Sequence, residues 1–387
     1  MSHDRLNIAL VGAAGLVAAP AHLNAIPTID RLNLVALCDV NADAVQALAD
    51  ERGVGKAYSS YDELLADPEI DAVDLVTPPF THAEMAIAAV QAGKHVYVEK
   101  PMARSLGEAR AMVQAAADAD VRLMVGESYV FHGPHLVARN LIEADAIGEV
   151  VQVRQTRGPW LFNEAENERL GGRGHHIAWR YDPTLSGGGD FPWMMDHGPH
   201  FFATARLFNG MSAIERVNAL PRPHGEGREE HLRGITAVTW MYEGGEVDGV
   251  WMQGDTVPEA GRYVGFRTEI VGAHGTILVF GEGGGSAPGY SQVAPVTLYA
   301  DGTERTFDPG EGSDRSWASN NSYYDRAHGN ALRNFAYTVL DGMRARYAPE
   351  DGVADLAATL ATIKSAMDGQ PVALADVPDE WTAYGAG

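Results

Sequence analysis

Cysteine is almost absent from this chain, since Cys38 is the only one. A single cysteine excludes an internal disulfide and a zinc site built from several cysteines, and it suits a reducing compartment. Long apolar runs are also missing, because none approaches the roughly 18 residues that a membrane-spanning helix needs. The opening residues, MSHDRLNIALVG, contain no basic stretch followed by a long apolar one, so no export signal is expected. These absences predict a cytoplasmic protein.

Positive charge is in short supply. The chain has 29 Lys and Arg against 52 Asp and Glu, which gives a formal net charge of -23. Such acidity repels phosphate backbones and anionic lipids, and it argues against nucleic-acid and membrane partners. What is abundant is apolar sequence, 45% of 387 residues. A chain of this length and composition is expected to form two domains with separate cores.

The first third alternates short β-branched runs with alanine-rich stretches. The runs predicted to be strands buried on both faces are LNIALVG, LNLVALCDV, AVDLVTP, KHVYVEK and RLMVGES. Between them, NADAVQALADERG and THAEMAIAAVQAG are typical of amphipathic helices that end near a glycine. This alternation implies right-handed crossovers and a doubly wound parallel sheet. We therefore predict an α/β Rossmann domain over residues 1–126.

After residue 148 the pattern changes to alternating or apolar runs separated by glycine-bearing turns, as in GITAVTWMYEGG and VDGVWMQGD. Such runs favour a large, open, mainly antiparallel sheet. Helices are expected around 133–147, 196–209 and 325–342, and a last helix, about 351–368, is expected to pack back on the sheet. We predict an α+β domain over residues 127–387. Its open apolar face predicts a homodimer or homotetramer.

A glycine-bearing turn, VGAAGLVAAPAH, follows the first predicted strand. A dinucleotide-binding fold needs a tight turn here, so that a pyrophosphate can approach the backbone. Gly12 fits the first glycine of G-x-G-x-x-G, whereas Ala14 and Val17 stand where the other two usually lie. The fingerprint is degraded, and a Gly-Ala-rich turn is the alternative. The residues of this loop expected to contact a cofactor are Gly12, Ala13, Ala14, Leu16 and Val17.

The second predicted strand ends at Asp39. A carboxylate at this point accepts hydrogen bonds from both hydroxyls of an adenosine ribose and repels the extra phosphate of NADP. No arginine follows in CDVNADA. We therefore expect NAD as the cofactor. The alternative is that Asp39 caps the next helix, although Asn41 or Asp43 can also do so.

The stretch FPWMMDHGPHFF, residues 191–202, places Asp196 and His200 four residues apart among large apolar side chains. Gly198 and Pro199 suit a first turn better than a helix interior. If the helix begins near Asp196 or Gly198, Asp196 and His200 share a face. The alternative reading makes Asp196 a helix cap and the histidines satisfied polar groups of the core.

One longer segment carries a family resemblance. AVDLVTPPFTHAEMAIAAVQAGKHVYVEKPMA, residues 72–103, resembles the Gfo/Idh/MocA family (glucose-fructose oxidoreductase, inositol dehydrogenase and rhizopine catabolism). The match includes Thr77-Pro78-Pro79, His82 and Glu99-Lys100-Pro101. Further on, the segment from Trp179-Arg180 to His200 looks like the family's W-R, G-G-G and D-x-x-x-H elements. With the terminal helix, the resemblance covers nearly the whole chain.

The resemblance implies roles for individual residues. Lys100 matches the family's catalytic lysine, Asp196 its active-site aspartate, and His200 the histidine taken as general acid/base. The Lys100-Pro101 bond is often cis in the family. The cofactor contacts implied beyond the first loop are Asp39, Thr77, Pro78, Pro79, His82, Glu99, Lys100, Trp179 and Arg180.

Elementary chemistry supports these roles. Oxidation of a secondary alcohol requires hydride transfer to a nicotinamide while a base removes the hydroxyl proton. His200 is the natural base, Asp196 is expected to orient its ring, and Lys100 is expected to donate a hydrogen bond to the alkoxide. No metal site is expected, because the chain has no H-E-x-x-H and the adjacent histidines of GHHIAW diverge in a strand.

An Arg- and His-rich segment, residues 154–180, precedes the catalytic stretch. One explanation for these cations is an anionic group on the substrate, which Arg173 and the histidines can clamp. The alternative is that they pair with Glu164, Glu166 and Glu168, while Arg180 lies near the cofactor. The residues expected to contact substrate are Lys100, Tyr129, Arg157, Trp160, Arg173, His175, His176, Asp196, His197 and His200; His197 is the ambiguous member, since a structural role is the alternative.

Together these features predict an NAD-dependent oxidoreductase that acts by hydride transfer on a secondary hydroxyl of a sugar, sugar acid or cyclitol. A second hypothesis is a redox-neutral NAD-dependent glycosidase of an anionic glycoside such as a sulfoquinovoside. It requires a further acid/base, for which Glu127, Tyr129, His132, His175 and His176 are candidates. A third hypothesis is a non-catalytic sensor of NAD or sugar on the same fold.

Overall fold

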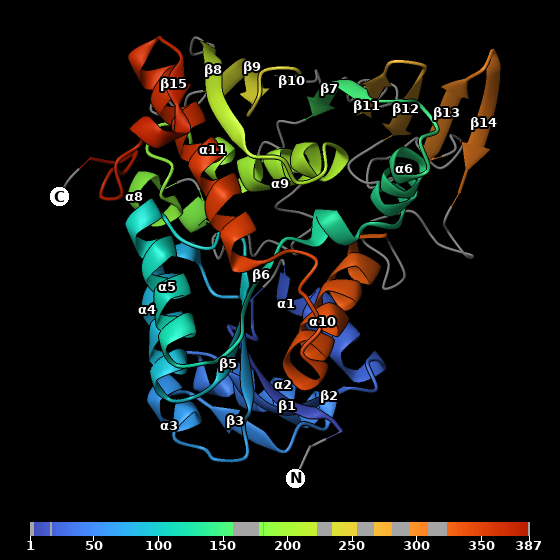
Figure 1. Cartoon of the computed structure of the whole chain (residues 1–387). Helices are drawn as coiled ribbons and strands as arrows, with labels where there is room; N and C mark the ends of the chain where they lie inside the picture. The colour runs from blue at the N-terminus through green and yellow to red at the C-terminus, as the bar shows by residue number, and fades with distance from the viewer. Residues whose placement is uncertain are drawn as a thin grey trace, which may run out of the picture.

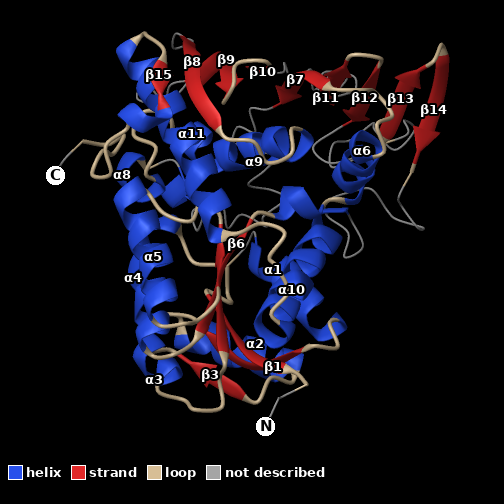
Figure 2. Ribbon diagram, viewed as in Figure 1, coloured by secondary structure: helices blue, strands red, loops and turns tan. Residues whose placement is uncertain are grey.

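The chain forms two sheets joined by helices that pass between them (Figure 1). A computed structural model describes residues 4–15, 18–157, 178–180, 182–222, 234–253, 267–280, 295–308 and 323–385. The N-terminal sheet lies at the bottom of the view and the second sheet spreads across the top. The helices of the C-terminal half lie between the two sheets and beside the first one (Figure 2). Among the described residues, no helix is long and apolar enough to cross a bilayer.

The first sheet is parallel and six-stranded, in the order β3-β2-β1-β4-β5-β6. Its strands are β1 (Leu6–Val11), β2 (Leu32–Cys38), β3 (Lys56–Tyr58), β4 (Ala72–Leu75), β5 (His95–Glu99) and β6 (Leu123–Gly126). The helices of this part are α1 (Ala18–Ala25), η1 (Ile26–Thr28), α2 (Ala42–Arg52), α3 (Tyr61–Leu65), α4 (Pro79–Gln91) and α5 (Leu106–Asp118). β1, β4 and β5 are almost entirely buried because helices cover both faces. The predicted doubly wound parallel sheet is confirmed.

The second sheet has nine strands, in the order β14-β13-β12-β11-β7-β10-β9-β8-β15. They are β7 (Val150–Arg157), β8 (Ile214–Arg222), β9 (Gly234–Tyr242), β10 (Asp248–Gln253), β11 (Arg267–Gly272), β12 (Gly275–Phe280), β13 (Val296–Ala300), β14 (Thr303–Phe307) and β15 (Val372–Ala373). β7 and β10 pair in parallel, and the other neighbours are antiparallel. The mainly antiparallel sheet is therefore confirmed.

The helices of this half are η2 (Ser128–Phe131), α6 (Gly133–Glu143), α8 (Pro183–Ser186), α9 (Pro192–Phe208), α10 (Tyr323–Asp341), α11 (Pro349–Asp368) and η6 (Leu374–Asp376). α11 packs on α9 and β8, so the last helix returns to the second sheet as expected. It also touches α5 and β6 of the first sheet's layers. α10 packs against α1, about 300 residues earlier in the chain. These two helices hold the halves of the molecule together.

The expected start of the helix that carries Asp196 and His200 is wrong. α9 begins at Pro192, so Gly198 and Pro199 lie in its interior. Pro192 occupies the first turn, where a missing N–H costs nothing. Gly198 is retained by packing, since a Cβ there would lie 2.7 Å from the side chain of Thr359 on α11. Because α11 crosses so closely, a glycine is needed inside the helix.

Candidate active site

The carboxyl ends of β1 and β4 meet where the strand order of the first sheet reverses, which is where ligands bind in such folds. Gly12 has φ +84°, and a Cβ on it would lie 3.1 Å from Cγ2 and N of Thr77. Only glycine accepts this dihedral and this approach of two loops without strain. The turn after β1 is therefore compact despite its degraded fingerprint, and N of Gly12 and N of Ala13 both donate to O of Cys38 at the end of β2. Leu16 and Val17 lie outside the described residues.

Asp39 at the end of β2 fixes that turn. Its Oδ2 accepts a hydrogen bond from N of Ala14 at 3.0 Å, and its Oδ1 accepts one from N of Asn41 at 3.1 Å. Asn41, not Asp39, caps α2 through N of Ala44. The next side chain, Val40, is 95% exposed and offers apolar surface beside the carboxylate. This combination fits the adenosine half of NAD.

His82 and the Thr77-Pro78-Pro79 turn form the opposite wall of this edge. Nδ1 of His82 lies 2.9 Å from O of Pro101, and Nε2 lies 2.7 Å from O of Thr77. His82 is fully buried. Its ring therefore ties the turn after β4 to the turn after β5, and its contact with the cofactor stays a prediction. The Lys100-Pro101 bond of the second turn is cis.

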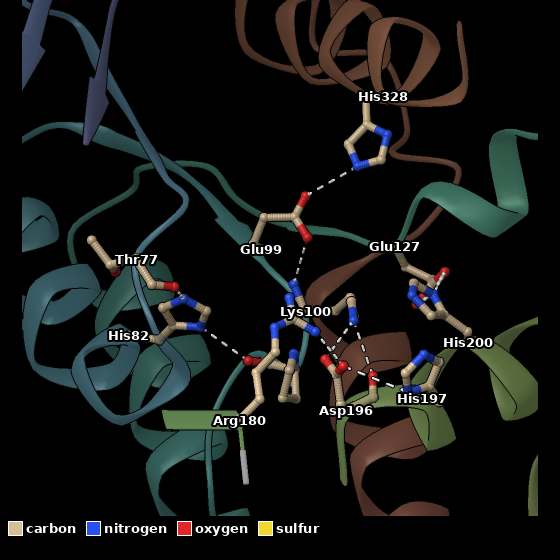
Figure 3. A network of polar contacts seen from close by, with 11 residues as sticks. Thr77, His82, Glu99, Lys100, Glu127, Arg180, Asp196, His197, His200 and His328 are labelled. Atoms are coloured by element: carbon tan, nitrogen blue, oxygen red, sulfur yellow. Dashed lines mark hydrogen bonds and ion pairs between the residues drawn. The ribbon is translucent and has the colours of Figure 1, made fainter. Parts of the chain in front are cut away.

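Lys100, directly after β5, meets Asp196 of α9 (Figure 3). Nζ of Lys100 donates to Oδ1 of Asp196 at 2.9 Å and to its backbone O at 3.0 Å, and Arg180 pairs with Oδ2. Burial alone would raise the pKa of Asp196, yet the charges of Arg180 and Lys100 hold it well below its ordinary value. Asp196 is thus a permanent anion between two cations.

His197 and the aromatic residues of α9 line the same region. Nδ1 of His197 lies 3.5 Å from Oδ2 of Asp196, and burial lowers the pKa of this ring to about 3, so His197 is neutral. Trp193 stacks on it, with ring centroids 5.1 Å apart. Among the described residues, neither Nδ1 of His197 nor Nε1 of Trp193 has a hydrogen-bond partner. Nδ1 of His197 lies beside Asp196, so this buried polar atom points to a polar ligand.

His200 is held by a residue other than the expected one. Its Nδ1 lies 2.7 and 2.9 Å from the two carboxylate oxygens of Glu127, whereas Asp196 is occupied by Lys100 and Arg180. The prediction that Asp196 orients His200 is wrong, because α9 presents the two side chains to different neighbours. Tyr129 stacks on the His200 ring at 4.0 Å and 12°. Sequence reasoning considered Glu127 only as a proton donor, although its place directly after β6 puts it at the ligand-binding edge.

Several predicted substrate contacts stay untested by the geometry. Trp160, Arg173, His175 and His176 lie outside the described residues, and only the backbone of Arg157 is described, at the end of β7. Arg154 lies on the second sheet, where it pairs with Glu269 at 3.7 Å. Trp179 lies 5.1 Å from the guanidinium of Arg180, next to the Lys100–Asp196 pair. Of the cationic side chains of this segment that the structure describes, Arg180 is thus the one brought to the site.

Comparison with known families agrees with this architecture. Residues 6–127 match a family model described as "Oxidoreductase family, NAD-binding Rossmann fold", and residues 135–278 match the "GFO/IDH/MocA C-terminal domain". Together the two models cover more than half of the chain. The chain is also similar to 1,5-anhydro-D-fructose reductase of Ensifer adhaerens, with 28% identity over 344 residues, 87% of this chain and 90% of that protein. Other curated relatives align over about half of their own length.

Solved structures share the fold. An oxidoreductase from Agrobacterium radiobacter in complex with NAD+, L-tartaric acid and magnesium superimposes with a TM-score of 0.77 at 20% identity, covering 96% of this chain and 99% of that one. A levoglucosan dehydrogenase in complex with NADH and levoglucosan gives a TM-score of 0.76 at 23% identity, with the same coverage. The chain belongs to the Gfo/Idh/MocA family of oxidoreductases, and its N-terminal part is an NAD-binding Rossmann fold.

Proposed function

We propose that this oxidoreductase is an NAD-dependent dehydrogenase that oxidises a secondary hydroxyl of a sugar, sugar acid or cyclitol. The observation that carries the proposal is the meeting of Lys100 and Asp196 beside the His200–Glu127 pair, at the edge of the NAD-binding sheet. The names of a similar reductase and a similar dehydrogenase, for 1,5-anhydro-D-fructose and levoglucosan, support small carbohydrates as the substrate class. Oxidation of an alcohol needs a base and a group that stabilises the alkoxide, and His200 and Lys100 are of the chemical types that can supply them.

NAD, when bound, supplies the hydride acceptor. We assign its binding to the turn after β1, at Gly12, Ala13 and Ala14, and to Asp39. One oxygen of Asp39 holds the amide of Ala14, so the carboxylate is oriented before the cofactor arrives. A fixed carboxylate favours the two hydroxyls of the NAD ribose and disfavours the phosphate of NADP.

His200 is assigned as the base that takes the hydroxyl proton. Because Nδ1 faces the Glu127 carboxylate, the exchange with substrate falls to Nε2. The carboxylate fixes the ring and stabilises the imidazolium that forms. Stacking on Tyr129 holds the plane of the ring.

Lys100 is assigned as the donor to the substrate oxygen. Its ammonium is held by two oxygens of Asp196 and keeps a third N–H for a ligand. A positive charge near the oxygen favours the alkoxide over the alcohol and so assists hydride departure. Asp196 positions Lys100, and its negative charge offsets part of the positive charge of Lys100 and Arg180. Nδ1 of His197, without a hydrogen-bond partner among the described residues, is assigned to a second substrate hydroxyl.

A paired assay tests the proposal. The purified enzyme with NAD is offered neutral sugars, cyclitols, sugar acids and nitrophenyl glycosides, and NADH and released nitrophenol are followed together. A dehydrogenase is supported if NADH accumulates as substrate is consumed. This NADH formation should be lost in Lys100→Met and His200→Asn, and it should be kept in Lys364→Met, a variant on the surface of α11. Nitrophenol release that requires NAD while NADH stays flat would replace it by the glycosidase hypothesis. Tight NAD binding without turnover of any compound would favour the sensor.

We also propose that the second sheet mediates a homodimer or homotetramer. Two apolar side chains of neighbouring strands are exposed on one face of this sheet: Met241 of β9 is 45% and Met252 of β10 53% exposed. Covering them removes apolar surface from water. Light scattering of the native protein and of a Met241→Lys/Met252→Lys variant tests this, since a native monomer excludes it.

A further inference from the structure

Beneath the catalytic lysine, a buried histidine bridges two carboxylates of the first sheet. His22 on α1 is fully buried, and its Nδ1 lies 2.7 Å from Oδ2 of Asp74 on β4. Its Nε2 lies 3.1 Å from Oε1 of Glu99 at the end of β5. Among the described residues, His22 and Asp74 are connected to Lys100 through Glu99, which contacts both His22 and the backbone of Lys100. A buried cluster of three ionisable groups therefore needs an explanation of its own.

With Asp74 and Glu99 ionised, both contacts of His22 require a proton on each ring nitrogen, because an ionised carboxylate only accepts hydrogen bonds. Burial raises the pKa of Asp74, and the charge of His22 beside it opposes that rise. The charge pattern agrees with a doubly protonated His22. Although burial alone would lower it, the nearby Asp74 and Glu99 raise the pKa of His22 to about 10. Burial would likewise raise the pKa of Glu99, yet the hydrogen bond and charge of His22 lower it to about 2. His22 is an imidazolium that keeps Glu99 ionised inside the protein.

Glu99 connects this cluster to the active site. Its second oxygen, Oε2, accepts a hydrogen bond from N of Lys100 at 3.2 Å, where the chain leaves β5. Space for the carboxylate is left by Gly126 on β6, where a Cβ would lie 2.8 Å from Oε1. His328 of α10 closes the other side, with Nε2 3.8 Å from Oε1 (Figure 3). The position of Glu99 is therefore fixed by several neighbours, and Lys100 is attached to it.

We propose that His22 is a positioning residue for Lys100. By holding Glu99, His22 sets where the ammonium of Lys100 lies against Asp196. Without His22, two carboxylates would remain buried side by side with no cation between them. The Glu99 side chain would then turn away and release the amide of Lys100. This inference rests on the proposed role of Lys100, but the position of Lys100 is measurable without catalysis.

The alternative explanation of this cluster is that it binds a metal ion. His22, Glu99 and His328 each offer one potential ligand atom, and these atoms lie within 4.8 Å of one another. A metal would replace the proton on Nε2 of His22, and the 3.1 Å contact with Glu99 is the distance of a hydrogen bond. Stoichiometric zinc in protein purified with added zinc, lost in His22→Gln, would overturn the proposal.

The experiment measures the acetylation rate of Lys100 by mass spectrometry in the full-length protein. The other lysines are Lys56, Lys94 and Lys364. Lys364, which pairs with Asp368 on the surface, is the internal reference. In His22→Gln we expect a several-fold rise in the Lys100/Lys364 rate ratio and, with substrate, a fall in kcat of about 10- to 100-fold. Leu23→Ala, which loosens the packing of α1 without touching the carboxylates, is the matched control and should leave the ratio unchanged.

A double variant, His22→Gln/Asp74→Asn, removes one cation and one anion together, and the amide of the introduced glutamine can still donate to Glu99. We expect it to fold even if the single variant does not, and to restore the native Lys100 ratio. An unchanged ratio in His22→Gln, or equal changes in His22→Gln and Leu23→Ala, would refute the positioning role. A changed ratio in a protein that oxidises no alcohol would sink the proposed function and leave the positioning of Lys100 intact.

Discussion

Replacing Glu127 with glutamine removes the charge that lies against Nδ1 of His200 while keeping the size of the side chain. Both contacts, at 2.7 and 2.9 Å, are buried. A hydrogen bond to a charged group contributes about 1.5–3 kcal/mol, and the imidazolium forms only as the proton is taken. Lost from the transition state alone, this energy corresponds to a fall in kcat of about 10- to 100-fold. The pH dependence of kcat should also change, because the anion that lies against the ring is gone.

The assay is a pH profile of kcat and kcat/KM for NADH formation, with native protein and Glu127→Gln side by side. Asp67→Asn is the matched control, because Asp67 is also a carboxylate engaged by hydrogen bonds, from Lys56 and Tyr58, far from the site. It should lower stability and leave kcat unchanged. Native kcat together with an unshifted profile in Glu127→Gln would show that Glu127 does not act through His200.

Three further results are expected. Asp39→Ser should raise kcat/KM for NADP relative to NAD, because the carboxylate that repels the NADP phosphate is removed. The ratio is measured with both cofactors at one substrate concentration, and an unchanged ratio contradicts the assignment of Asp39. The pKa of His22 rises from 6.5 to about 10 on folding, so unfolding between these pH values releases a proton. Thermal stability should therefore decline as pH increases from about 6.5 to 10. Calorimetry should show a flatter decline in His22→Gln. Gly126→Ala should lower the free energy of unfolding by about 1–3 kcal/mol in a urea titration, since its Cβ would press on Glu99 and Tyr97 at 2.8 Å; a variant as stable as the native protein would mean that the cluster has room to move.

The sequence by itself determined the element types and the class of chemistry. Alternating buried strands and helices can only form a parallel sheet with crossover connections, and this period is local information. The positions of Gly12, in the turn after one strand, and of Asp39, at the end of the next strand, are also local information. Glu99-Lys100-Pro101 and D-x-x-x-H were readable because each lies within a few residues.

Which residues far apart in the sequence contact one another was decided only by the tertiary structure. The i, i+4 spacing of Asp196 and His200 is compatible with a pair, but Asp196 meets Lys100, 96 residues away, and His200 meets Glu127, 73 residues away. Spacing along one helix says which residues share a face, and it does not say which distant groups arrive there. Likewise, Gly198 reads as a helix start until Thr359 of α11 is seen against it. His22 gave no chemical signal in the sequence, because its two carboxylates come from β4 and β5, which only the folded sheet sets side by side.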